Sequence, residues 1–146
     1  MGFLSSMNIS ASGMTAERRR LDTIAENISN INTTRTEGGG PYRRKVVVFE
    51  QRQGASFRNV LRDKMGMGKE DPGVKVSRIL EDPSPLKTVY DPEHPDADEF
   101  GYIELPNIDL VKEITDSMSA TRAYEANVTV FNAVKLMASK ALEIGR

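Results

Sequence analysis

The sequence has no cysteine, no tryptophan and few aromatic residues, which make up 6% of the chain. Without cysteine there can be no disulfides, no thiolate metal sites and no thiol nucleophiles. The low aromatic content argues against a large conventional globular core. We expect instead that helices pack on one another through Met, Leu, Ile, Val and Ala side chains.

Long apolar runs and an excess of one charge are also missing. No segment contains the roughly 18 consecutive apolar residues that a membrane helix needs. The formal net charge is −1, from 20 basic and 21 acidic residues, so we expect neither nucleic-acid binding nor direct lipid binding. Residues 1–14 lack the basic region and unbroken apolar run of a secretory signal. We therefore expect any export to proceed without a cleaved leader.

The seven prolines all lie between two proline-free ends. Residues 4–31 and 107–144 are amphipathic at helical spacing, which predicts a mainly α protein whose long N- and C-terminal helices pair as a coiled-coil-like layer. We expect residues 1–37 and 107–146 to form one discontinuous helical assembly domain. Residues 38–106 are expected to form a small β-rich or extended middle insert.

Apolar residues recur every seven positions near both ends, as in helices that keep one face toward a partner. Met7, Met14 and Leu21 begin the first stripe, and Tyr124 begins the second. The second stripe is too wide for one partner, which indicates burial against several neighbours. The predicted assembly interface consists of Met7, Met14, Leu21, Ile24, Ile28, Ile31, Tyr124, Asn127, Val128, Phe131, Met137 and Leu142.

Three polar or small residues lie within or beside these stripes. Gly13 predicts either a break in the first helix or a very close contact with another helix, because glycine costs about 1 kcal/mol relative to alanine inside a helix. Asn127 lies at the edge of an apolar face, where it is either partly exposed or sets the register between helices. Arg18 belongs either to a solvated face or to a pair with an acidic residue of a neighbour.

The expected element bounds follow from caps and turn residues. The first helix should begin near Ser5 or Ser6 and end around 30–32, and the second should begin at 106–109, with Asp109 and Glu113 favouring the positive end of its dipole. Strands are expected within 42–50, 74–79 and 86–90, whereas residues 52–72 predict a loop.

The candidate catalytic and metal sites are weak. His94, the only histidine, lies near Asp96, Asp98 and Glu99, but the glycine and downstream bidentate glutamate of a calcium loop are missing. No nucleophile-elbow or phosphate-loop motif is present. We therefore expect no catalytic residues, no metal site and no cofactor, and we do not expect an enzyme.

Several motifs carry a family resemblance. The segments SGM at 12–14 and LDTIAENISNINT at 21–33 resemble the N-terminal motif of bacterial flagellar axial proteins of the rod and hook. Other segments narrow the likeness to the proximal rod members of that family. They are YRR at 42–44, DPSP at 82–85, VYDPEHPDAD at 89–98, GY at 101–102, PN at 106–107, YEAN at 124–127 and LEIG at 142–145.

The resemblance implies a structural subunit of the flagellar basal-body rod. Members of this family join their terminal helices into a layer that lines the export channel of a tubular structure. The resemblance also implies passage through the flagellar type III export apparatus, and contacts with other rod proteins and with copies of the same chain. The alternative is a helical export chaperone or adaptor that presents a groove to a partner.

Overall fold

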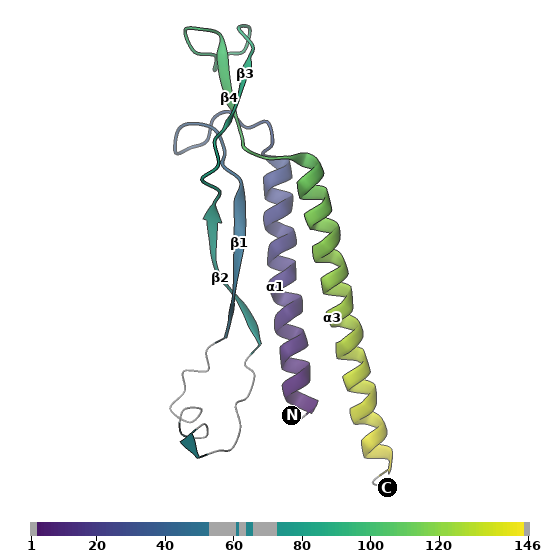
Figure 1. Ribbon diagram of the computed structural model, residues 1–146. Coiled ribbons are helices and arrows are strands. Elements are labelled where there is room, and N and C mark those ends of the chain that lie inside the picture. Colours follow the sequence, from purple (N-terminus) through teal and green to yellow (C-terminus); the bar gives the residue numbers. More distant parts are fainter. Residues whose placement is uncertain (1–2, 53–60, 62–63, 66–72, 145–146) are drawn as a thin grey trace.

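The protein is described by a computed structural model that covers residues 3–52, 61, 64–65 and 73–144. Two long helices lie side by side, with two small antiparallel sheets beside and beyond them (Figure 1). The elements in chain order are α1 (Phe3–Ser29), β1 (Lys45–Gln51), β2 (Val74–Glu81), β3 (Lys87–Tyr90), β4 (Tyr102–Leu105) and α3 (Leu110–Ile144). The predicted mainly α fold with a β-containing middle is therefore confirmed.

The start and end of α1 and the start of α3 lie within three residues of their expected positions. α1 ends at Ser29, and the Asn30 side chain donates from Nδ2 to the Glu26 carbonyl (2.8 Å). α3 starts after Asp109, whose Oδ1 accepts from the amides of Val111 (2.9 Å) and Lys112 (3.4 Å). Asp109 therefore caps the helix by accepting amide hydrogens that have no carbonyl partner inside it.

The two sheets have two strands each. β1 pairs with β2, with Val47 opposite Ile79, and the register shifts between Val48 and Phe49. β3 pairs with β4, with Val89 opposite Ile103. The three predicted strands are thus present, whereas most of the predicted loop at 52–72 lies outside the described residues.

The β1–β2 hairpin is fastened to α1 at Gly73. This glycine has φ +78°, a backbone conformation that other residues adopt only with strain. A Cβ atom there would also collide with the hydroxyl of Ser12. The adjoining Val74 amide donates to Ser12 Oγ at 3.0 Å. Ser12 therefore marks the side of α1 that the hairpin covers.

The helices run antiparallel in a constant register. A Cβ atom on Gly13 would lie 3.0 Å from the side chain of Asn127, and Asn27 Nδ2 donates to Glu113 Oε2 at 3.1 Å. Both pairs are separated by 14 positions on each helix (27 − 13 and 127 − 113). The contact line, which we call the seam, therefore includes Ala120, a fully buried residue that lies midway between Glu113 and Asn127. α1 continues through Gly13, so the prediction of a close interhelical contact there is confirmed and the predicted break is not observed.

None of the described helices combines the length and the apolar character that crossing a bilayer requires.

Candidate assembly interface

Three successive residues of α1 face three different directions. Successive residues of a helix are rotated by about 100°, Ser12 bonds to the hairpin, and Gly13 contacts α3. Met14 therefore faces the side of α1 that lies away from the hairpin. Met7 and Leu21 share that side through the seven-residue spacing, and all three methionine and leucine side chains are half-buried.

α3 contributes to the same side. Because the helices are antiparallel, one step forward from the seam on either helix turns toward the same outer side. Val128 follows Asn127, so it lies on the same outer side as Met14. Asp116 lies on the other flank of α3, where it contacts Arg44, the residue just before β1. We call the half-buried residues on this side the free helix face. They are Met7, Met14 and Leu21 of α1 and Tyr124, Val128 and Phe131 of α3.

The structure places the other predicted interface residues in two groups. Ile24 is buried, and Asn127 is half-buried at the seam. Ile28 and Ile31 are also half-buried, and Ile28 continues the seven-residue spacing of Met7, Met14 and Leu21. Met137 and Leu142 lie on the last turns of α3, where 52% and 77% of their surfaces are exposed. The seam itself therefore uses small and polar residues, and the larger apolar residues of the predicted stripe lie beside it.

A buried polar cluster joins α1, α3 and β1, and the sequence analysis did not identify it. Asn27 Nδ2 donates to the Lys45 carbonyl (2.9 Å) as well as to Glu113. Its Oδ1 accepts from the Lys45 amide (2.9 Å) and from the Tyr42 hydroxyl (3.2 Å). The side chain thus pairs with Lys45 as a strand backbone would. Asn27 is 1% exposed, so these bonds replace the water that it loses on folding.

Arg44 supplies the positive charge of this cluster, which we call the joint. Its Nε donates to Oε1 of the fully buried Glu113 at 2.6 Å, and its Nη2 donates to Asp116 Oδ2 at 3.3 Å. Its Nη1 lies 3.6 Å from Asp82 Oδ2. Burial opposes the charge of Arg44, but the hydrogen bond and charge of Glu113, with the other carboxylates, raise the pKa of the guanidinium. The hydrogen bonds from Ser84, and secondarily Arg44, lower the pKa of Asp82.

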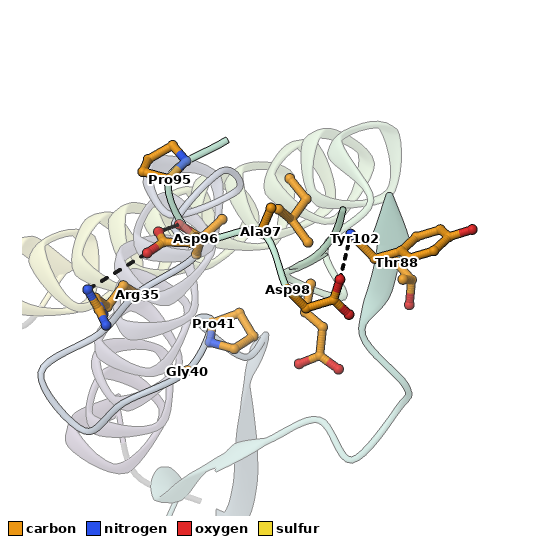
Figure 2. Close-up of a pocket in the computed structure, with 12 residues that line it drawn as sticks. Arg35, Gly40, Pro41, Thr88, Pro95, Asp96, Ala97, Asp98 and Tyr102 are labelled. Carbon is orange, nitrogen blue, oxygen red and sulfur yellow. Dashed lines mark hydrogen bonds and ion pairs between the residues drawn. The ribbon is translucent and has the colours of Figure 1, made fainter. Parts of the chain in front are cut away.

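A second feature lies beyond the helices. A cleft of about 640 Å³ opens between the segment 34–41, the turn 91–101 and the strands β3 and β4. Figure 2 shows Asp96 beside Arg35, to which a dashed line joins it, and Asp98 with Tyr102 on the other side of the cleft. His94 does not line the cleft, and its Nδ1 accepts from the Asp96 amide at 3.1 Å. Among the described residues, no three histidine or carboxylate side chains gather as a metal site would require.

Comparisons with known proteins match both helices. Residues 7–35 match the family described as flagella basal body rod protein, and residues 100–144 match the C-terminal family of the flagellar basal body rod FlgEFG proteins. The FlgC rod protein of Bacillus subtilis is 49% identical over 146 residues, covering 97% of each chain. The FlgC protein of Borreliella burgdorferi is 46% identical, covering 99% of this chain and 98% of its own. That of Escherichia coli O157:H7 is 38% identical over the full length of both.

The chain belongs to the FlgC family of flagellar basal-body rod proteins. FlgC proteins are structural components of the rod and are not enzymes, so the predicted structural role and the predicted lack of catalysis are confirmed. The relatives give no support to the alternative of an export chaperone. In this FlgC chain the two matched ranges include Asn27 and Glu113, whereas Arg44 lies between them and connects them in space.

The joint makes the stability of this FlgC chain depend on pH through Tyr42. Burial, and secondarily the charge of Glu26, raise the pKa of its hydroxyl from 10.0 to about 12. A raised pKa means that the neutral form is stabilised in the folded state. This contribution is complete below pH 10 and is lost as the pH rises toward 12. Over that range we expect the wild type to lose about 1–2 kcal/mol of unfolding free energy that the Tyr42→Phe variant does not lose.

The measurement is urea unfolding at pH 8 and pH 11.5, followed by circular dichroism. Tyr90→Phe is the matched control, because the Tyr90 side chain is 64% exposed. Equal pH dependence in the wild type and in the Tyr42→Phe variant would contradict the assignment.

Proposed function

We propose that this FlgC-family chain polymerises through its terminal helices into the tubular proximal rod of the basal body. In this proposal, residues 1–37 and 107–146 act as one discontinuous assembly domain, and the helix pair becomes part of a coiled-coil-like layer around the export channel. The neighbours are copies of the chain and other rod proteins. Delivery occurs through the flagellar type III export apparatus.

The observation that carries the proposal is the free helix face. The seam already joins α1 to α3 through Gly13 and Asn127, so the apolar side chains of Met14, Leu21 and Val128 are not needed to hold the two helices in register. They remain half-exposed on the side away from the hairpin. Exposed apolar surface of this kind is typical of protein–protein contact sites. We therefore expect a helix of a neighbouring subunit to cover this face.

The test is Met14→Glu in cells where the variant replaces the resident protein. A carboxylate buried in an apolar contact without a partner is strongly unfavourable, so we expect intact basal bodies to be lost. Thr15→Glu is the matched control, because Thr15 is the next residue of α1 and is exposed. It should leave the number of basal bodies unchanged. Purified proteins should show equal helical circular dichroism. Normal rods with Met14→Glu would refute the proposal.

A further inference from the structure

The hairpin of β1 and β2 and the helix α3 pack on different sides of α1. The strands contact each other and α1, whereas α3 contacts α1 alone among the described elements (Figure 1). Arg44, the residue just before β1, crosses this arrangement, and its guanidinium reaches Glu113 and Asp116 of α3. No other described residue of 42–52 or 73–82 forms a hydrogen bond or an ion pair with α3. The Arg44 side chain is therefore the direct polar link between the hairpin and α3.

Asn27 of α1 is bonded to both sides at once. An asparagine side chain can donate two hydrogen bonds and accept two. Asn27 makes all four, with the carbonyl and amide of Lys45, the hydroxyl of Tyr42 and Oε2 of Glu113. Because Asn27 is buried, the loss of one partner while the others stay leaves a polar group unsatisfied, which costs free energy.

Partly formed versions of the joint are therefore unfavourable. If the hairpin left while the helices stayed paired, the fully buried Glu113 would lose its cation, and a buried charge without a partner is strongly destabilising. If α3 left instead, Arg44 and Asn27 would each lose a bond to Glu113. Half-satisfied polar networks are costly at low dielectric constant. The joint thus favours states in which all three segments are in place, or none.

We propose that the joint is a two-way latch: the paired helices hold the hairpin against α1, and the docked hairpin holds α3 against α1. The latch operates within a single chain, so it goes beyond the proposed rod function and does not depend on it. Such coupling is reciprocal. A partner that stabilised the helix pair would also fix the hairpin, on which the Val46, Ile79 and Leu80 side chains are exposed. Contact at one surface of the subunit would then prepare another.

The test is hydrogen exchange, followed by NMR, in the purified full-length chain. Two amides report the docking of the hairpin on α1, because Lys45 donates to Asn27 Oδ1 (2.9 Å) and Val74 donates to Ser12 Oγ (3.0 Å). The amide of Ala120 reports the ordering of α3. Neither hairpin bond involves α3, so any effect of α3 on these two amides has to be transmitted.

Arg122→Gly combined with Glu125→Gly weakens α3 without touching the hairpin, because both side chains are exposed and glycine is a poor helix former. We expect exchange at Ala120, Lys45 and Val74 to accelerate together, by about tenfold. Arg122→Ala with Glu125→Ala is the matched control and should leave all three rates within about threefold of the wild type. Unchanged rates at Lys45 and Val74 in the glycine variant would overturn the proposal.

A second pair of changes separates the latch from unfolding of the whole chain. Arg44→Met with Glu113→Leu replaces the buried ion pair by apolar side chains, an exchange that often preserves stability. In this background the two glycine changes should still accelerate exchange at Ala120, but no longer at Lys45 and Val74. Acceleration of all three amides in that background would mean that the chain unfolds as one unit, and would overturn the proposal.

The reverse test leaves the joint unchanged. Gly73→Ala strains the hairpin, since Gly73 has φ +78° and a Cβ atom there would collide with the Ser12 hydroxyl. A two-way latch requires this variant to accelerate exchange at Ala120 by about the same factor as at Lys45. Faster exchange at Lys45 with unchanged protection of Ala120 would overturn the proposal, even if the Arg44→Met and Glu113→Leu variant fails to fold. Either result leaves the Met14→Glu test of rod assembly unaffected.

Discussion

Replacing Arg44 by alanine is expected to destabilise the folded chain by about 3–5 kcal/mol, because removal of one partner leaves a buried charge without compensation. Glu113 is completely buried, and Arg44 provides its only ion pair among the described residues. The same guanidinium also approaches Asp116 and Asp82. The loss of Arg44 would therefore remove the ion pairs that hold the start of β1 against α3 and beside Asp82.

Urea unfolding of the purified full-length chain measures this effect. Arg43→Ala is the matched control, since Arg43 precedes Arg44 and forms no ion pair with a described residue; its effect should stay within about 0.5 kcal/mol. Arg44→Lys should be intermediate, because a single ammonium cannot reach three carboxylates as a guanidinium does. Adding Glu113→Leu to Arg44→Ala should recover part of the stability. A loss below about 1 kcal/mol for Arg44→Ala would show that the joint is dispensable.

Gly13→Leu is expected to cost about 1–3 kcal/mol through overpacking of the seam, despite the better helix propensity of leucine. Even a single Cβ atom at this position would lie 3.0 Å from the Asn127 side chain. The helices would have to separate or shift along one another. Either change would disturb the registry between the seam and the free helix face, so assembly should fall together with stability.

A double-mutant cycle isolates this contact. Asn127→Ala removes the side chain that Gly13 faces, so Gly13→Leu should cost far less in that background. Gly38→Leu serves as the glycine control, because the nearest atom to a Cβ there is Thr36 Oγ1 at 4.0 Å. Additive effects of the changes at positions 13 and 127 would contradict the proposed close approach.

Local patterns were enough to predict most of the fold. The caps, the glycine and proline positions and the valine-rich segment predicted both helices and the main strands, because these signals depend on near neighbours in the chain. Gly13 was also informative, since an interior glycine costs stability unless something needs the space. The structure provides that reason in Asn127.

The joint could not be predicted in the same way. Its members lie far apart in the sequence, and each has an ordinary local explanation: Asn27 near a helix end, Glu113 in the first turn of a helix, and Arg44 within a short basic run. Only the fold brings them together, with Asn27 and Glu113 separated by 86 positions. The seam was likewise offset by one residue from the apolar stripe. Periodicity reveals that a helix has an apolar side, but not which of two adjacent partners that side will meet.

The antiparallel arrangement of the helices has a consequence for the polarity of the polymer. α1 begins and α3 ends at one end of the molecule, and the turn between β3 and β4 lies at the other (Figure 1). The two ends of each subunit are therefore different. In the proposed tube, subunits aligned in one direction would display helix termini at one end and the turns between β3 and β4 at the other. The two ends of that tube would differ chemically, so its tip could be distinguished from its base by the subunits alone.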